Sequence, residues 1–236
     1  GKSNCYLAKK DGKYAIFDIN GKMISPEWFD DISLDGLVYG ESDYYVAKKD
    51  GKYAIFHKDG NMISPDWFDG IYFEGLVKGE SIYYVAKKDW KWAIFDKYGN
   101  QITPGWFSIV YTLGLVEGQS KYYVAERDSK YAIFDKDGNQ ISDWYDWIYP
   151  AGLVVGQSDY YIACNTKKCA VYYKNGQKVS KDFPKKDVNF VGEITFNENL
   201  GIVEIKNYNR ITKSIDFNPV YPFKEEIIDY TKLLNI

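Results

Sequence analysis

Residues 36–56 read Gly-Leu-Val-Tyr-Gly-Glu-Ser-Asp-Tyr-Tyr-Val-Ala-Lys-Lys-Asp-Gly-Lys-Tyr-Ala-Ile-Phe, and the same pattern returns at residues 75–95 and 114–134. The copies start at residues 36, 75 and 114, so the period is 39 residues. A fixed period of this size is typical of solenoids, propellers and stacked arrays, in which a single unit cannot bury its own core. The pattern therefore predicts one tandem-repeat domain.

The repeat divides the 236-residue chain into a repeat domain, residues 1-195, and a divergent segment, residues 196-236. The five predicted units cover about residues 1-42, 43-81, 82-120, 121-158 and 159-195. In the divergent segment, apolar residues such as Phe223 and Ile227 follow helical spacing. We therefore expect a short C-terminal helix over residues 222–236, with the divergent segment packed on the repeats.

Within a unit, strand-like runs alternate with turn residues. In the copy that starts at residue 75, the predicted strands are residues 76–79, 83–88, 91–95 and 100–103. The turns carry Asp-Gly or Asn-Gly pairs in most copies, which are strong hairpin signals because Gly and Asx tolerate positive φ. Each unit is therefore predicted to be a four-stranded antiparallel meander, the size of a small propeller blade.

The two faces of the central hairpin are both apolar. Pairing across the two-residue turn at 50–51 puts Val46 opposite Ile55 on one face and Ala47 opposite Ala54 on the other. A sheet with one solvated face would alternate apolar and polar residues instead. Each meander is thus expected to be sandwiched between neighbouring units, with the Ala pair leaving room for bulky side chains.

The strands at the two ends of the repeat domain favour a closed ring. The first unit lacks its Leu-Val strand, and residues 187–194 look like a surplus copy of the linker and that strand. A surplus strand at one end and a missing strand at the other can close a ring, which leaves no sheet edge exposed. The preferred architecture is an all-β five-bladed β-propeller, and the alternative is an open β-solenoid with the C-terminal segment as a cap.

The unit resembles a known bacterial repeat. Its order of features is Val-Ala-Lys-Lys-Asp-Gly-Lys-Tyr-Ala-Ile-Phe, a Gly turn, Ile-Ser-Pro-x-Trp-Phe-Asp and then Gly-Leu-Val. This order resembles the WG repeat, also called the KWG repeat, over about residues 1–180. Tyr53-Ala54 stands where the family has its name-giving Trp-Gly pair. The resemblance implies a binding or scaffold module, since such repeats are mostly of unknown function.

Composition excludes some partners. The net charge of −3 is too small to indicate an electrostatic partner, and Arg127 and Arg210 are the only arginines. Because arginine supplies the forked donor that phosphates and base edges favour, nucleic acid is not an expected partner. The sequence has no run of about 18 apolar residues, so no membrane span is expected. Aromatic residues make up 18% of the chain, a content that suits strands and binding surfaces.

Residue types that carry catalysis or hold cofactors are sparse. The single histidine, His57, stands beside a hairpin turn without a recognisable base or nucleophile partner. Residues 135–139 resemble a calcium loop, but the acidic positions change between units while glycine persists, as in a plain turn. Three cysteines and one histidine at scattered positions make a poor zinc site. We expect no catalytic residue, no metal and no cofactor.

Carboxylates recur after the Trp-Phe pair at Asp30, Asp69 and Asp146, and Ser108 interrupts the series. In a ring, equivalent positions approach one rim, and paired carboxylates can hydrolyse glycosides. The other interpretation is that each Asp caps its linker turn. A non-enzymatic scaffold for protein–protein interaction is the preferred function. The alternative is a lectin-like carbohydrate-binding module, and a glycosidase is a remote alternative.

Departures from the repeat are the candidate ligand-binding positions, because the shared residues mostly serve packing. Trp90 replaces a glycine at a hairpin tip, Trp92 replaces a nearby tyrosine, and Trp147 replaces a linker glycine. A Trp at a turn tip either packs on a neighbouring unit or contacts a ligand. Both interpretations are open at this point.

The fifth hairpin carries two cysteines that we expect to form a disulfide. With residues 166–167 as a two-residue turn, Cys164 and Cys169 form a non-hydrogen-bonded pair, in which Cα atoms approach to about 4.5 Å. The alternative is two reduced thiols packed in the unit. An oxidised bridge favours an extracytoplasmic or hyperthermophile origin, and leaves Cys5 as a thiol outside the bridge.

Overall fold

A computed structural model describes residues 4–188, 193–207 and 210–220. Within these residues the chain is almost entirely antiparallel β-structure, with one helical turn and one 3-10 turn. In chain order the elements are β1 (Cys5–Lys10), β2 (Lys13–Asp18), β3 (Asp31–Ile32), β4 (Tyr44–Lys49), β5 (Lys52–His57), β6 (Gly70–Tyr72), α1 (Glu74–Val77), β7 (Tyr83–Lys88), β8 (Lys91–Asp96), β9 (Ile109–Val110), β10 (Tyr122–Arg127), β11 (Lys130–Asp135), β12 (Trp147–Tyr149), β13 (Tyr160–Cys164), β14 (Lys168–Tyr173), β15 (Phe183–Pro184), η1 (Lys185–Asp187), β16 (Glu193–Asn197), β17 (Ile202–Asn207) and β18 (Arg210–Asp216).

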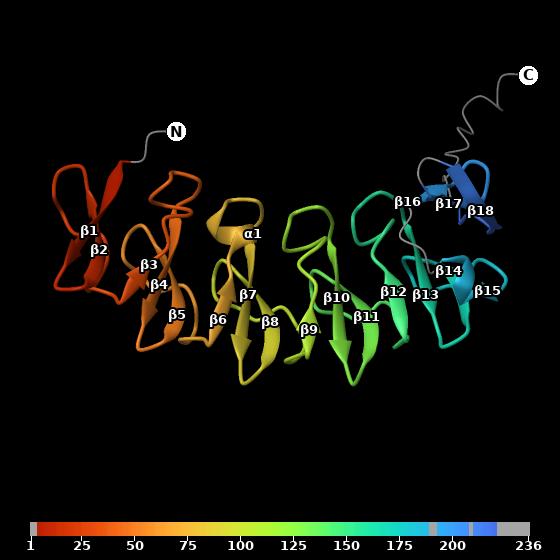
Figure 1. Cartoon of the computed structure of the whole chain (residues 1–236), viewed down its shortest axis with the longest axis horizontal. Helices are drawn as coiled ribbons and strands as arrows, with labels where there is room; N and C mark the ends of the chain where they lie inside the picture. Colours follow the sequence, from red (N-terminus) through yellow and green to blue (C-terminus); the bar gives the residue numbers. More distant parts are fainter. Residues whose placement is uncertain (1–3, 189–192, 208–209, 221–236) are drawn as a thin grey trace, which may run out of the picture.

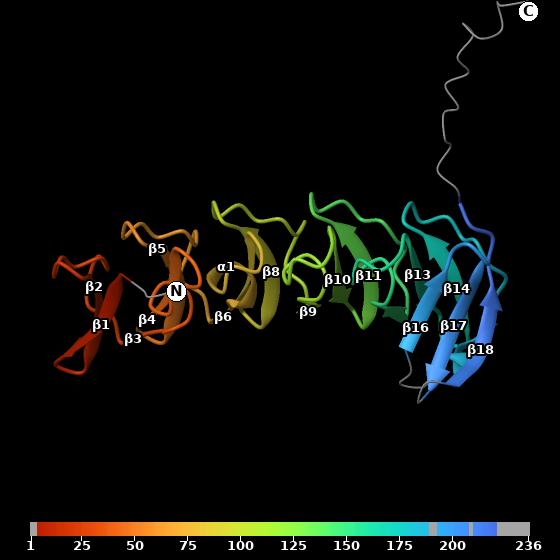
Figure 2. The ribbon, with the colours of Figure 1, turned by 90° about the horizontal axis from the view of Figure 1, so that it is seen from above.

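The repeat units stand side by side in an open row, with the first hairpin and the last sheet at opposite ends (Figures 1 and 2). The predicted all-β class of tandem antiparallel meanders is confirmed. The preferred five-bladed ring does not close, because the sheets form an open row. Of residues 187–194, expected to complete the first unit, residues 193 and 194 begin β16, which pairs with β17, while β1 pairs with β2 in a two-stranded sheet.

The C-terminal sheet β16–β17–β18 is the physical reason that the row ends. It packs on the Val-Ile face of the fifth hairpin, where Ile162 and Val171 meet Val203 and Ile215 in one buried cluster. A ring would need that face to cover the first hairpin instead. The expected C-terminal helix, residues 222–236, lies outside the described residues.

The second, third and fourth hairpins belong to three-stranded sheets rather than to the predicted four strands, whereas the fifth belongs to a four-stranded sheet, β12–β13–β14–β15. The residues after Trp-Phe-Asp form a short strand, so that β6 pairs with β7, which pairs with β8. The run at 100–103, predicted as a strand, contributes an isolated bridge between Phe95 and Gln101. The register of the central hairpin agrees with the prediction, with Val46 opposite Ile55 and Ala47 opposite Ala54.

The Gly-Leu-Val segment, predicted as the first strand of the unit, is a turn. In the copy that starts at residue 75 it is α1, where the Val77 backbone N–H donates to the Phe73 carbonyl at 3.1 Å. The turn keeps the Val77 carbonyl out of any strand ladder, and Ser42 Oγ of the preceding copy donates to it at 2.5 Å. The segment therefore joins two units, which a strand within one sheet would not do.

Neighbouring units share their cores through unlike faces. The Val46 and Ile55 face of the second hairpin packs on Tyr84, Ala86 and Phe95 of the third. The same contact recurs between the other neighbours. Each interior hairpin is therefore buried on both faces, as the sequence predicted.

Candidate functional site

The hairpin tips line up along the lower edge of the row in Figure 1. The two-residue turns of the first four hairpins have positive φ at both positions, as at Asp50 and Gly51 with φ of 50° and 79°. This is the type I′ geometry that Asp-Gly favours. In the third tip, Trp90 holds φ at 64° although left-handed backbone is strained for a bulky residue. We call this row the tip edge.

Trp90 is the most exposed of the large apolar side chains at the tip edge, with 83% of its surface accessible. The Lys87 ammonium lies 4.5 Å from its ring centroid and 5.3 Å from that of Trp92. Trp92 is half-buried and packs against the core shared by the third and fourth units. The structure thus brings Trp90 and Trp92 together around one lysine, and Trp90 does not pack on a neighbouring unit.

Trp147 lies apart from these two, in β12 of the fifth sheet. It is 36% exposed, and its ring centroid is 5.2 Å from that of Tyr131 and 6.2 Å from that of Tyr149. Trp147 therefore lies within an aromatic cluster between the fourth and fifth units. The three predicted tryptophans do not form a single site.

Replacing Trp90 with glycine is expected to leave the free energy of unfolding within about 1 kcal/mol of the wild type. The exposed Lys87–Trp90 contact contributes about 0.5–1 kcal/mol, and relief of the left-handed φ offsets a similar amount. Trp92→Ala is the matched control and should cost about 2 kcal/mol, because Trp92 packs on the core. Urea titration of both variants measures the difference. A large loss for Trp90→Gly would place Trp90 in the core.

The recurring carboxylates join neighbouring hairpins. Asp30 lies 2.8 Å from Lys13 Nζ of the first hairpin and accepts the Asp50 backbone N–H of the second at 2.7 Å. Asp69 repeats the arrangement with Lys52 at 3.3 Å and the Asp89 N–H at 2.9 Å. Each carboxylate serves a different pair of hairpins. We call each such contact a junction and number the junctions from the N-terminus.

A second acidic residue, three positions earlier, completes these junctions. Glu27 lies 2.7 Å from Lys49 in the first junction, and Asp66 lies 2.7 Å from Lys88 in the second. The Lys13 ammonium lowers the pKa of Asp30, and the Lys88 ammonium lowers the pKa of Asp66. Both carboxyl groups are therefore charged at neutral pH.

Asp146 performs the same role in the fourth junction, between Lys130 at 2.6 Å and Thr166 Oγ1 at 2.8 Å. The Lys130 ammonium is the main cause of the lowered pKa of Asp146. Charge between hairpins is thus neutralised within the chain in the first, second and fourth junctions.

The third junction lacks both acids. Gly105 stands where the first two junctions have Glu27 and Asp66, and Ser108 stands where they have Asp30 and Asp69. Their cationic counterparts, Lys91 and Arg127, are both exposed and have no ion pair among the described residues.

The Arg127 guanidinium instead lies 4.5 Å from the Trp144 ring centroid. Sequence reasoning noted Ser108 but missed this loss of charge pairing. An alignment of the linkers against the hairpin lysines would have revealed it, because each acid has its lysine at a fixed distance along the chain.

The other candidate residues have local roles. His57 Nδ1 lies 3.1 Å from an Asp59 carboxylate oxygen beside the turn. Asp135 accepts the backbone N–H groups of Asp137 and Asn139 at 2.9 Å each, as a turn-capping residue does. Within the described ranges, no group of three or more His, Cys, Asp or Glu residues is placed to hold a metal ion.

Cys164 lies opposite Cys169 in the β13–β14 pair, and the structure joins them in a disulfide with a Cα–Cα distance of 4.0 Å. Both residues are buried in the cluster beneath the C-terminal sheet. Neither Thr166 nor Lys167 has a positive φ, so this turn differs from the Asp-Gly turns of the other hairpins. Cys5 Sγ lies 3.5 Å from the Leu37 carbonyl oxygen.

The oxidation state of the pair remains a prediction. Alkylation in denaturant without reductant, followed by mass spectrometry, is expected to modify one cysteine per chain and to modify three after reduction. Modification of all three without reductant would rule out the bridge in that sample. Because the closed loop is short, the bridge should contribute about 2 kcal/mol or less on the chain-entropy model.

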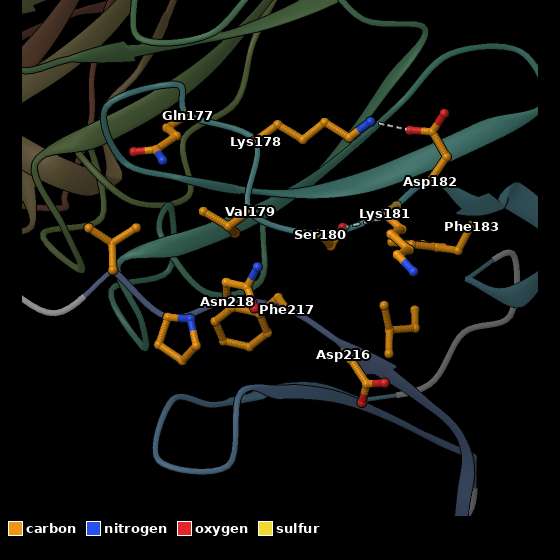
Figure 3. Close-up of a pocket in the computed structure, with 13 residues that line it drawn as sticks. Gln177, Lys178, Val179, Ser180, Lys181, Asp182, Phe183, Asp216, Phe217 and Asn218 are labelled. Atoms are coloured by element: carbon orange, nitrogen blue, oxygen red, sulfur yellow. Dashed lines mark hydrogen bonds and ion pairs between the residues drawn. The ribbon is translucent and has the colours of Figure 1, made fainter.

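A groove of about 700 Å³ lies between the last repeat and the end of the C-terminal sheet (Figure 3). Residues 177–183 form one side, where Lys178 and Asp182 make an ion pair. Residues 215–220 form the other side, with Asp216 and Asn218 among its polar groups. The groove abuts residue 220, the last one that the structure describes. Its mixed lining offers no acid–base pair or metal-binding set.

Fold and site together define an all-β tandem-repeat protein whose repeats form an open row. No protein-family model matches the chain, and no curated protein matches its sequence. None of the helices in the described part of the chain has the length and apolarity to cross a bilayer.

Solved structures with partial likeness include β-propellers. Kluyveromyces lactis Hsv2 with its complete loop 6CD is 11% identical with a TM-score of 0.36, and the match covers 86% of this chain and 66% of that one. The β-propeller domain of Myceliophteria thermophila Cps50 (Swd1) is 10% identical with a TM-score of 0.31, over 92% and 81% of the two chains. A putative TolB from Agrobacterium tumefaciens is 14% identical with a TM-score of 0.28, over 77% and 78%. These TM-scores are too low to assign the chain to any of the three folds.

Proposed function

We propose that the chain is a non-enzymatic binding module for protein partners and that the tip edge carries its contact surface. The observation that supports this most directly is Trp90, a large aromatic side chain held exposed in a strained left-handed conformation. Strained residues persist where function requires them, and exposed Trp is enriched in binding hot spots. The resemblance to the WG repeat, which implies a scaffold, is part of the same proposal.

The open row supports a scaffold role on physical grounds. Each interior hairpin is fixed on both faces by its neighbours, so the tips form a preorganised surface along the row. Preorganisation lowers the entropic cost of binding. Asp30, Asp69 and Asp146, the candidates for glycoside hydrolysis, each occupy a separate junction with its own lysine. A glycosidase needs two carboxylates on one bond, so hydrolysis is the less favoured function.

Selection of a random 12-residue peptide library on the immobilised chain tests the proposal. We expect enriched peptides that bind saturably and lose binding to the Trp90→Gly variant, which is expected to retain the fold. A glycan array is the parallel measurement for the lectin-like alternative. Saturable binding to glycans, with no enriched peptide, would contradict the proposed protein-binding function and support the lectin-like one.

A further inference from the structure

We propose that the third junction binds an acidic peptide segment of a partner protein, with two carboxylates three residues apart. The inference rests on the proposed function, because it names the chemistry of the ligand for the same surface. Its starting point is that the chain supplies this pair of carboxylates itself in the first and second junctions, as Glu27 with Asp30 and Asp66 with Asp69.

The backbone of the third junction is the same as that of its neighbours. The Ser108 N–H donates to the Glu126 carbonyl at 3.0 Å, as the Asp69 N–H donates to the Lys87 carbonyl at 2.9 Å. The Phe107 N–H likewise donates to the Trp92 carbonyl at 2.9 Å. The third junction therefore differs from the others in side chains rather than in chain path.

The first carboxylate of the peptide would take the place of the Asp69 side chain. In the second junction that group accepts from Lys52 and from the Asp89 backbone N–H. The corresponding donors of the third junction are Lys91 Nζ and the Asp128 N–H. Neither has a partner among the hydrogen bonds and ion pairs of the described residues. Charge-assisted hydrogen bonds of this type are the stronger ones in proteins.

The second carboxylate would take the place of the Asp66 side chain and meet Arg127. Arg127 can bind a carboxylate through two parallel hydrogen bonds, which the equivalent lysines cannot. Room for the group is present, because a Cβ added to Gly105 would have no atom within 4 Å. The φ of Gly105 is not in the left-handed region, so the backbone there does not require glycine.

Trp90 supplies apolar surface at the same hairpin tip as Lys91, which it directly precedes in the chain. Its ring lies 4.5 Å from the Lys87 ammonium, and 83% of its surface is accessible to a peptide residue. The acidic residues nearby do not oppose the proposal. Asp89 and Asp128 occupy the tip position that Asp50 holds in the first junction, where a carboxylate is bound. Glu126 pairs with Tyr131 on the opposite face of the hairpin from Arg127, since successive strand residues alternate faces.

The carboxylate spacing favours a peptide over an acidic polysaccharide. The two cations are arranged to fit acids at positions i and i+3 of one polypeptide, which is how Glu27 and Asp30 are linked. The chain thus contains a template for its ligand. A fluorescein-labelled peptide with the sequence of residues 25–31, Ser-Pro-Glu-Trp-Phe-Asp-Asp, is a suitable probe.

Fluorescence anisotropy with the full chain tests the proposal. We expect saturable binding of this peptide, and about tenfold weaker binding of a control peptide carrying Glu27→Gln and Asp30→Asn, which corresponds to about 1.4 kcal/mol. The double variant Gly105→Glu, Ser108→Asp restores the missing acids within the chain. It should weaken binding of the acidic peptide about tenfold or more while leaving thermal stability unchanged or slightly raised.

A matched double variant excludes a general charge effect. Asn20→Asp with Gln157→Glu adds the same two charges at exposed positions away from the third junction, and should change affinity less than about twofold. Equal binding of the acidic and amide peptides would overturn the proposal. In a second contrary outcome, labelled oligogalacturonate binds more tightly than the acidic peptide and loses affinity in the Gly105→Glu, Ser108→Asp variant. That result would overturn the proposal in favour of an acidic glycan. If the acidic peptide fails while neutral library peptides bind, the acidic inference is wrong and the protein-binding function stands. If no peptide binds, both are wrong.

Discussion

Replacing Gly114 with alanine is expected to lower the free energy of unfolding by about 3 kcal/mol and the melting temperature by about 6–12 °C. Gly114 has a φ of 88°, and a Cβ there would lie 2.3 Å from the Tyr122 carbonyl oxygen and 2.6 Å from that of Val154. Both oxygens belong to backbone, Tyr122 in the fourth hairpin and Val154 in the turn before the fifth. The clash therefore cannot be relieved by rotating a side chain.

Gly51→Ala is the matched control for this prediction. Gly51 has a similar φ of 79°, but a Cβ there would meet no atom within 4 Å. The control therefore carries the cost of the left-handed backbone alone, about 1 kcal/mol. Thermal unfolding followed by circular dichroism measures both variants. Equal losses would mean that close approach between units does not require glycine at position 114.

Replacing Ile94 with alanine is expected to cost about 3–4 kcal/mol, within the range for large-to-small changes in protein cores. Ile94 has no accessible surface, and it packs in the cluster that joins the third unit to Phe107, Tyr123 and Phe134. The cavity would lie between two units rather than within one. Because each unit depends on its neighbours for burial, the loss should also broaden the unfolding transition.

Ile19→Ala provides the control, since Ile19 is 69% exposed in a turn of the first unit. Its effect should stay within about 0.5 kcal/mol. Urea titration of the two variants compares the loss of the same side chain in two environments. A small effect of Ile94→Ala would show that the core between the third and fourth units can collapse around the missing atoms.

The open row changes how the candidate sites are interpreted. In a ring, the recurring carboxylates would approach one rim, whereas in the row each lies in its own junction. A missing pair of acids in one junction then leaves that junction different from all the others. Gly105 and Ser108 create such a difference next to Trp90, and the binding proposal depends on this coincidence.

Hairpin register was predictable because it follows from local chemistry. Asp50-Gly51 fixes a two-residue turn, and the turn fixes Val46 opposite Ile55. The pairing of Cys164 with Cys169 followed from the same register. The Gly-Leu-Val segment was mispredicted because its apolar residues fit a strand as well as a turn. The hydrogen bond from Ser42 to the Val77 carbonyl, which links two units, is absent from any local pattern.

The sequence by itself determined the repeat, the hairpins, their register and the two apolar faces, since each depends on residues close together in the chain. Tertiary structure decided what covers each face. Tyr6 and Tyr84 hold the same place in the repeat, yet Tyr6 is 48% exposed and Tyr84 is fully buried, because a preceding hairpin covers Tyr84 alone. The choice between ring and row was likewise decided by the C-terminal sheet, which occupies the last Val-Ile face. Whether a face is buried depends on which element packs on it. The repeated local sequence is the same in covered and in exposed units, so it cannot tell them apart.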